Sequence, residues 1–191
     1  MKKPLFSLAI ATLLSAALTT TVSAQAMMTP GTVMVGGEAM YPNKNIVANA
    51  VNSKDHTTLV AAVKAAGLVE TLQGKGPFTV FAPVNDAFEN LPAGTVETLL
   101  KPENKATLTK VLTYHVIAGN MTADKLMSAI KAGKGKASLK TVSGGTLVAS
   151  MNGAHNVVLT DESGNTASIS TYDVMQSNGV IHVIDKVLLP K

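Results

Sequence analysis

The chain has 191 residues, which is enough for one domain and marginal for two. Without Lys2 and Lys3, which belong to an N-terminal signal, 14 lysines, no arginine and 12 acidic residues remain, a net charge of +2. This balance, and the absence of the arginines that read phosphates and bases, argues against a nucleic-acid partner. No cysteine is present, so disulfides are excluded and the hydrophobic core must hold the fold together.

Residues 1–24 have the pattern of a secretory signal peptide. Two lysines stand near the start, an apolar run covers residues 5–18, and Val22-Ser23-Ala24 forms a small-residue cleavage site. The apolar run is short for a membrane span, so we expect cleavage near Ala24 rather than an anchor. The sequence therefore predicts a secreted or periplasmic protein without a transmembrane segment after cleavage.

Residues 25–43 are rich in Met, Gly and Thr and predict a flexible leader arm without regular structure. Met28, Met34 and Met40 are spaced six residues apart in this arm. Two interpretations are open: a thioether cluster that binds a soft metal such as Cu(I), or methionines that dock on the body of the domain.

Residues 44–133 are mainly helical by their periodicity. Leu59, Ala62, Val63 and Ala66 recur at helical spacing before Gly67, a typical helix end. A short strand is expected at residues 78–82 and another at 115–117. We further expect Asn85 or Asp86 to cap a short helix, Pro102 to lie in the first turn of a later helix, and Thr122 to cap a last helix that Gly133 ends.

After Gly133 the apolar period changes from 3.6 to 2, which predicts strands near 137–142, 146–151, 156–160, 166–171 and 180–189. Helices followed by a β-meander indicate an α+β domain over residues 44–191. Both faces of the last run are mostly apolar, so we expect that strand to be covered on both sides and inserted between earlier elements.

Three stretches resemble the signatures of the fasciclin (FAS1) domain family. They are Gly76-Pro77-Phe78-Thr79-Val80-Phe81-Ala82-Pro83-Val84-Asn85-Asp86-Ala87-Phe88, Tyr114-His115-Val116-Ile117 and the C-terminal residues 178–190. Their order and separation are similar to those of one complete domain of the small bacterial secreted type. The resemblance implies a wedge-shaped β-sandwich with an N-terminal helical layer. It also implies a role in adhesion or matrix binding, with no enzymatic activity common to the family.

The resemblance implies two regions for partner binding. Tyr114 and His115 match the Tyr-His region that family members with integrin-dependent adhesion use. A second family motif, Glu-Pro-Asp-Ile-Met, aligns with residues 171–175: Asp173 and Met175 match, Val174 is close, and the first two positions differ. The alternative interpretations are a core histidine at His115 and a turn cap at Asp173.

Other side chains offer weaker signals. His182 alternates with apolar residues and is expected to be a bonded core group, and residues 161–165 fit a hairpin turn better than a calcium loop. A concentration of positive charge around residues 125–140 predicts either a weak patch for acidic polysaccharide or anionic cell surface, or solvated lysines near a helix end; these are Lys125, Lys131, Lys134, Lys136 and Lys140.

We therefore expect an exported, non-enzymatic domain that binds an extracellular or cell-surface protein or polysaccharide. No cofactor and no metal site are expected. The alternative is a periplasmic binder of a small apolar ligand or a soft metal, in the gap between sheet and helices or in the methionine arm. The sequence does not define an oligomeric state.

Overall fold

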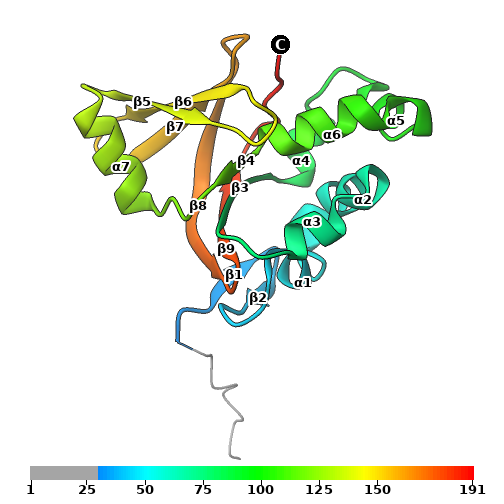
Figure 1. The fold of residues 1–191 in the computed structure, drawn as a ribbon, viewed down its shortest axis with the longest axis horizontal. Helices are drawn as coiled ribbons and strands as arrows, with labels where there is room; N and C mark the ends of the chain where they lie inside the picture. The colour runs from blue at the N-terminus through cyan, green and yellow to red at the C-terminus, as the bar shows by residue number, and fades with distance from the viewer. Residues whose placement is uncertain (1–29) are drawn as a thin grey trace, which may run out of the picture.

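The computed structural model describes residues 30–191 (Figure 1). The expected signal peptide, with its expected cleavage site near Ala24, and the first residues of the arm lie outside this range. One side of the domain is a helical layer and the other is a bent sheet with one further helix. The helical elements are α1 (Ile46–Ala50), the 3-10 turn η1 (Lys54–His56), α2 (Thr57–Ala66), α3 (Val69–Gln73), α4 (Asn85–Glu89), α5 (Thr95–Leu99), the 3-10 turn η2 (Pro102–Asn104), α6 (Lys105–Tyr114) and α7 (Ala123–Ala132).

Among the described residues, the main sheet has seven strands in the order β4-β3-β9-β8-β7-β6-β5, and a separate two-stranded sheet pairs β1 with β2. Only β3 and β9 pair in parallel within the main sheet. The α+β fold class, with a helical layer before a β-meander, is therefore confirmed. The strands are β1 (Val33–Val35), β2 (Glu38–Met40), β3 (Phe78–Pro83), β4 (Val116–Ala118), β5 (Lys136–Lys140), β6 (Thr146–Asn152), β7 (Asn156–Thr160), β8 (Thr166–Gln176) and β9 (Gly179–Ile184).

The last strand, β9, lies between β3 and β8, as its two apolar faces predicted. All six of its residues are buried. The prediction that it continues to residue 189 is wrong. Pro83 is the last residue of β3 to pair with β9, opposite Ile184, and the chain of β3 then turns into α4, so no parallel neighbour remains beyond this point. Val187 and Leu188 remain buried without belonging to a strand.

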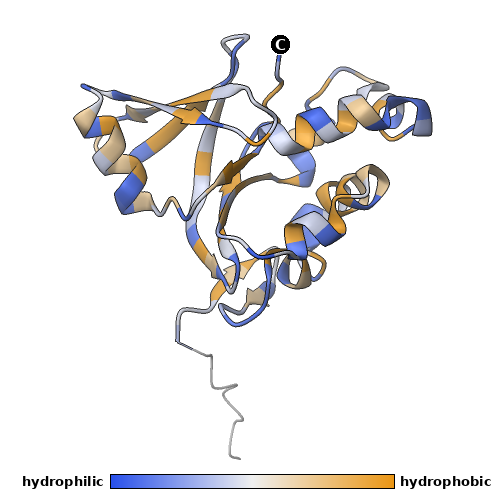
Figure 2. Ribbon diagram, viewed as in Figure 1, coloured by the Kyte–Doolittle hydropathy of each residue, from blue (hydrophilic) through white to orange (hydrophobic). Residues whose placement is uncertain are grey.

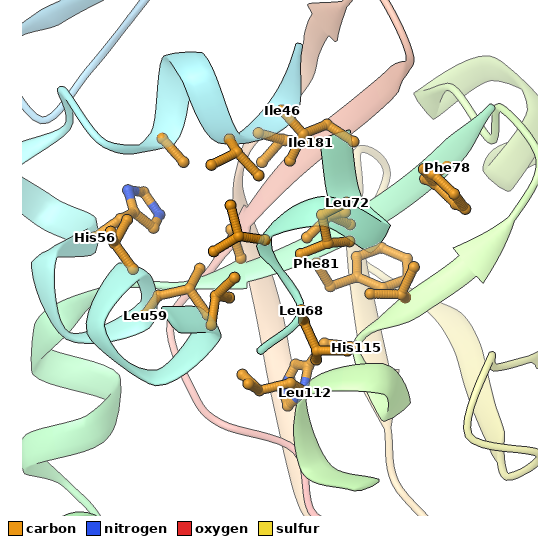
Figure 3. Close-up of a pocket in the computed structure, with 18 of the residues that line it drawn as sticks. Ile46, His56, Leu59, Leu68, Leu72, Phe78, Phe81, Leu112, His115 and Ile181 are labelled. Atoms are coloured by element: carbon orange, nitrogen blue, oxygen red, sulfur yellow. The ribbon is translucent and has the colours of Figure 1, made fainter. Parts of the chain in front are cut away.

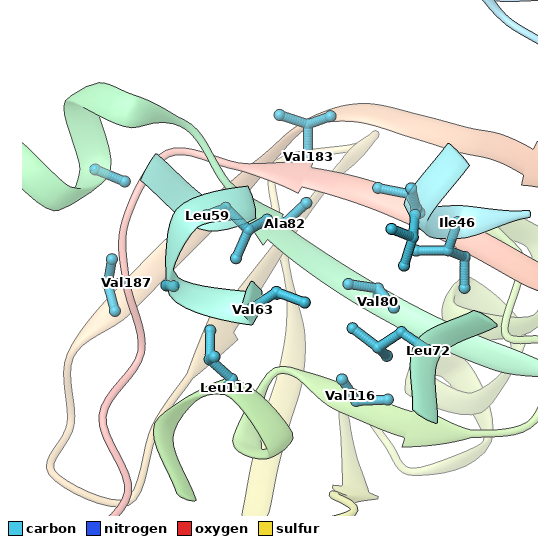
Figure 4. Packing of buried hydrophobic residues seen from close by; sticks show 14 of the residues in the cluster. Ile46, Leu59, Val63, Leu72, Val80, Ala82, Leu112, Val116, Val183 and Val187 are labelled. Carbon is cyan, nitrogen blue, oxygen red and sulfur yellow. The ribbon is translucent and has the colours of Figure 1, made fainter. Parts of the chain in front are cut away.

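Two clusters of buried side chains form the core. The first lies between the helical layer and strands β3 and β9, and includes Leu59, Val63, Leu72 and Val80 (Figure 4). The second lies under α7 and includes residues of β5, β6, β7 and β8 together with Tyr114 and Phe81. The central strands are mostly hydrophobic, whereas the helices carry both hydrophobic and hydrophilic residues (Figure 2). This pattern is typical of helices that cover one face of a sheet.

Part of the expected leader arm is folded, so the prediction of an arm without regular structure is wrong for residues 33–40. β1 and β2 form a hairpin through Gly36 and Gly37, whose φ angles of 60° and 76° suit a tight hairpin turn. Val35 and Met40 share one face of the hairpin and are buried in the first core cluster. Apolar contact with the domain therefore holds the hairpin in place.

Two asparagines of the signature stretches join distant segments. The Asn178 Oδ1 accepts a hydrogen bond from the Ile46 amide at the start of α1, and its Nδ2 donates to the carbonyls of Leu72 and Gly74. Asn85 was expected to cap its own helix, but its Oδ1 accepts from the Thr58 amide, and its Nδ2 donates to the Lys54 carbonyl. Both side chains therefore satisfy backbone groups at the ends of other helical segments, a role that only the tertiary fold creates.

Candidate functional site

Tyr114, the last residue of α6, is fully buried. Its hydroxyl donates to the Thr146 carbonyl at 2.8 Å and accepts from the Glu162 amide at 3.2 Å. Burial is the main reason that the pKa of Tyr114 is raised. The ring packs so closely on the turn before β6 that a Cβ at Gly145 would lie 2.7 Å from it. Tyr114 therefore holds two turns of the second core cluster and presents no side chain to a partner.

His115 follows directly and is also buried, at 3% exposure. Its Nδ1 donates to the Val111 carbonyl at 2.8 Å, and its Nε2 accepts from the Leu188 amide at 3.0 Å, so the ring is a neutral tautomer. Burial lowers the pKa of His115 to about 4. The interpretation of His115 as a bonded core histidine is confirmed, and its contact with Leu188 ties the C-terminal segment to α6.

Asp173 lies inside β8 and not in a turn before the last strand, so its interpretation as a turn cap is wrong. The pairing of β8 with β9 is irregular between Thr171 and Val174, and Asp173 has a φ of 52°. This conformation directs the Asp173 Oδ1 to the Ala123 amide, at 2.8 Å. Thr122 occupies the N-cap position of α7, but its side chain makes no capping hydrogen bond. Asp173, on β8, therefore supplies the side-chain acceptor for the N-terminus of α7 that Thr122 does not supply.

His182, on the neighbouring strand β9, makes hydrogen bonds that stabilise the irregular backbone of β8 at Asp173. Its Nδ1 accepts from the Asp173 amide at 3.3 Å, and its Nε2 donates to the Met121 carbonyl at 2.8 Å. The ring stacks on Phe81 with a centroid distance of 5.7 Å. Burial lowers the pKa of His182. The expectation of a bonded core histidine is thus confirmed, and the network fixes the backbone of β8 relative to α7.

The five residues singled out by the resemblance do not form one continuous surface. Tyr114, His115 and Val174 are buried. Asp173 and Met175 are partly exposed, at the irregular part of β8. Only these last two can touch a partner directly.

The expected hairpin turn at residues 161–165 is confirmed. Asp161 is 5% exposed, and its Oδ1 accepts from the amides of Ser163 and Asn165. Its Oδ2 accepts from the Asn165 side chain and from the Leu189 amide. Burial alone would raise the pKa of Asp161, but these hydrogen bonds outweigh its effect and hold the pKa below its usual value. The carboxylate is thus used by the turn itself.

No group of three or more His, Cys, Asp or Glu side chains within residues 30–191 is placed to hold a metal ion. Met34 and Met40 cannot share a thioether site, because they lie on opposite faces of the β1–β2 hairpin. Met34 is 50% exposed, whereas Met40 is 2% exposed in the core. Met28 lies outside the described residues. The idea of a soft-metal cluster formed by Met28, Met34 and Met40 together is therefore wrong, and the docking interpretation holds for Met40.

The exposed side of α7 and the edge strand β5 carry a basic surface, which we call the lysine face: Lys125, Lys131, Lys134, Lys136 and Lys140. All five residues are exposed, and none takes part in an ion pair within the described chain. No Asp or Glu occurs from residue 125 to residue 160. α7 and β5 lie together at the end of the molecule away from the helical layer (Figure 1). The positive charge of this face is therefore not neutralised by its own segment.

An apolar cavity of about 90 Å³ lies between the helical layer and the sheet. Side chains from α1, α2, α3, α6, β3 and β9 surround it, with His56 at one end and Phe78 at the other (Figure 3). Ile46, Leu72 and Ile181 are among the aliphatic residues that line it. The sequence analysis offered the gap between sheet and helices as an alternative ligand site, but it did not name the residues that line the cavity.

The described part of the chain contains no helix long and apolar enough to cross a membrane. Its buried polar side chains are engaged largely in internal hydrogen bonds, and it presents both a charged surface and an apolar cavity. The fold defines the class: an α+β domain with a helical layer on one side and a bent sheet on the other. Comparisons with known proteins show the family within that class.

A family model described as the fasciclin domain matches residues 54–190, and the chain belongs to this family. Protein sll1483 of Synechocystis is 44% identical over 171 residues, which cover 90% of this chain and 87% of that protein. Immunogenic protein MPB70 of Mycobacterium bovis is 32% identical over 165 residues, 84% of this chain and 75% of that protein.

A longer relative contains the domain as one part of its length. Transforming growth factor-beta-induced protein ig-h3 of Sus scrofa is 37% identical over 134 residues, 70% of this chain and 17% of that protein. Among solved structures, a FAS1 domain pair from the insect cell adhesion molecule Fasciclin I matches with a TM-score of 0.68 and 18% identity, over 78% of this chain and 51% of that one. At this identity the match supports the fold alone.

Proposed function

We propose that the protein is an exported, non-enzymatic binding domain that attaches to an anionic component of a cell surface or extracellular matrix. The observation that carries this proposal is the lysine face, with five exposed lysines in a stretch of 36 residues that has no acidic residue. Like charges gathered on one surface attract polyanions and accelerate their association.

Export is part of the proposal and rests on the signal-like residues 1–24. Asp173 and Met175 form a second, separate contact in this proposal, beside the first residue of α7, where Asp173 accepts a hydrogen bond from the Ala123 amide. Tyr114, His115 and Val174 contribute from inside, by holding the backbone on which the surface is built. An adhesion role through protein contacts at Asp173 and Met175 remains part of this proposal.

The test is binding of the mature protein to immobilised alginate, an acidic polysaccharide, with dextran as the neutral control. The triple variant Lys131→Glu/Lys136→Glu/Lys140→Glu is expected to lose at least about tenfold in affinity, and wild-type binding is expected to weaken as salt rises. A matched triple variant, Lys75→Glu/Lys101→Glu/Lys105→Glu, makes the same change in net charge on the helical side and is expected to retain most of the affinity. Equal losses in the two variants would contradict a localised site.

Cell binding tests the partly exposed residues separately. The variants Asp173→Ala and Met175→Ala should reduce attachment of the protein to intact cells if these side chains touch a partner. Tyr114→Ala and His115→Ala must be compared at matched folded fraction, measured by circular dichroism, because both residues are buried. Normal attachment of folded Asp173→Ala and Met175→Ala protein would remove both residues from the proposed surface.

A further inference from the structure

His56 differs from the other buried histidines because part of its ring has no partner. It lies at the end of η1, is 3% exposed, and lines the apolar cavity. Its Nδ1 is 2.8 Å from the Ser53 hydroxyl oxygen. Its Nε2 is buried and has no partner in good hydrogen-bond geometry; the Ala82 carbonyl is close enough to raise the pKa of His56 somewhat, but this contact does not meet the geometry of a hydrogen bond to Nε2. By contrast, His115, which also lines the cavity, has both ring nitrogens paired.

An unsatisfied buried nitrogen is costly, since leaving such a group without a partner destabilises a protein by about 1–3 kcal/mol. Most buried polar side-chain atoms in proteins have a hydrogen-bond partner, so an atom without one calls for an explanation. Burial is the main influence on the ring and lowers the pKa of His56, which keeps it neutral. A neutral imidazole nitrogen at the edge of an apolar space is suited to a hydrogen bond with a ligand of mixed character.

The walls of the cavity determine the rest of such a ligand. Apart from the histidines and a few polar groups, the lining is aliphatic and aromatic, with Phe78 opposite His56 (Figure 3). Pockets of this kind bind through apolar contact, and a small number of polar groups fix the orientation of the ligand. A volume of about 90 Å³ admits only a small molecule, with about six non-hydrogen atoms as the upper limit.

We propose that this cavity binds a small, mainly apolar molecule that carries one hydroxyl or carbonyl oxygen, and that this oxygen hydrogen-bonds to Nε2 of His56. The site is separate from the lysine face and goes beyond the proposed surface-binding function. It gives the domain a small-ligand activity that does not depend on a macromolecular partner.

Two shape-matched probes test the proposal: cyclopentanol and methylcyclopentane, which differ by a hydroxyl in place of a methyl group. In NMR titrations of the wild-type protein, both are expected to shift the methyl signals of Ile46, Leu72 and Ile181. Only cyclopentanol is expected to shift the Nε2 signal of His56. The absence of methyl shifts with either probe, or an unchanged Nε2 signal with bound cyclopentanol, would overturn the proposal.

The variant His56→Phe removes the hydrogen bond while keeping an aromatic ring. It is expected to weaken cyclopentanol binding by at least about fivefold relative to methylcyclopentane, because the bound hydroxyl loses its partner. If this variant does not fold, the Nε2 signal of the wild-type protein decides the question alone. An unchanged ratio of the two affinities in folded His56→Phe protein would contradict the assigned contact.

A second pair of variants tests the position of the site. Ala50 lines the cavity and Ala65 is exposed on α2. Ala50→Leu is expected to reduce the affinity for both probes by about tenfold or more, because the added side chain occupies part of the space. Ala65→Leu makes the same chemical change outside the cavity and should leave both affinities unchanged. Equal effects of the two changes would place the binding elsewhere.

Discussion

The two core clusters of this domain are packed differently. The cluster under α7 contains most of the large side chains that are completely buried, such as Tyr114, Phe81, Leu147 and Leu159. The cluster under the helical layer includes more partly buried residues at its margin and borders the apolar cavity. The cavity is lined by the ten-residue helices α2 and α6 and by the five-residue helices α1 and α3. The comparison indicates that several separate helices leave a space where they meet over the sheet, whereas α7 and the strands beneath it enclose their side chains completely.

The difference in packing corresponds to two different roles for the two clusters. The densely packed cluster gives a rigid support for the exposed lysine face and for the backbone at Asp173. The helical layer, with its cavity and the unpaired Nε2 of His56, is the place where the interior can accept another molecule. Close packing resists change, whereas atoms beside a void have already lost some of their contacts.

The largest expected effect comes from a matched pair of leucine truncations. Leu147→Ala in the densely packed cluster is expected to lower the free energy of unfolding by about 4–5 kcal/mol. Leu72→Ala, at the wall of the cavity, should cost about 2–3 kcal/mol, because Leu72 has neighbours on fewer sides. Urea unfolding followed by circular dichroism measures both values. Equal losses would show that the two clusters are packed equally well.

A second effect is pH dependence through His115. Its pKa is about 4 in the folded protein and about 6.5 in the unfolded chain, so the unfolded state binds the proton more readily. The contribution of His115 to stability is complete above pH 6.5 and falls by about 3 kcal/mol as the pH drops toward 4. The pKa values of His56 and His182 are also lowered, so they add to the same trend.

Unfolding free energies measured by urea from pH 7.5 to pH 4 test this prediction. The variant His115→Gln should have a shallower pH profile than the wild type, although it is less stable at neutral pH. His155→Gln, at an exposed position of the β6–β7 turn, serves as the control and should keep the wild-type profile. A wild-type slope in His115→Gln would contradict the assigned role of the ring.

The smallest expected effect concerns Asp173, at the junction of β8 and α7. Asp173→Ala should cost about 1–2 kcal/mol, because it removes the acceptor of the Ala123 amide and places alanine at a positive φ. Asp173→Asn keeps an oxygen acceptor and tolerates this backbone conformation, so its cost should be below about 1 kcal/mol. Thermal unfolding compares the two variants. A larger cost for Asp173→Asn would show that the charge, and not the hydrogen bond, stabilises α7.

Several predictions from sequence agree with the structure because they depend on neighbours along the chain. The change of apolar period after Gly133 correctly indicated where the meander begins, and the alternation within residues 180–184 correctly indicated a strand covered on both sides. The wrong predictions concern residues whose partners or burial depend on a segment far away in the sequence. Asn85 caps a helix 27 residues earlier, and Met40 is buried although its surroundings in sequence are those of a flexible arm.

The candidate sites follow the same division. Residue types alone identified the lysine-rich stretch, because its charge does not depend on the fold. The core interpretation of His115 was among the sequence-based alternatives, whereas the burial of Tyr114 had no local signal, since its hydroxyl bonds turns more than 30 residues away. The alternative interpretation placed a small apolar ligand in the gap between sheet and helices, but the sequence named no residue that lines it. The lining residues and the unpaired nitrogen of His56 emerge only from the structure, because a void arises from how side chains of several elements fit together.

The sequence by itself determined the order of helices and strands, the fasciclin signatures and the uncompensated charge of residues 125–140, since periodicity, turn residues and charge are local properties. Only the tertiary structure decided which polar groups are used internally and which remain open. In the folded domain, His115 accepts a hydrogen bond from the Leu188 amide, and Asp173 accepts one from the first residue of α7. The Nε2 atom of His56 is left facing an apolar space. These outcomes depend on contacts between segments far apart in the chain, and such contacts exist only when the whole domain has folded.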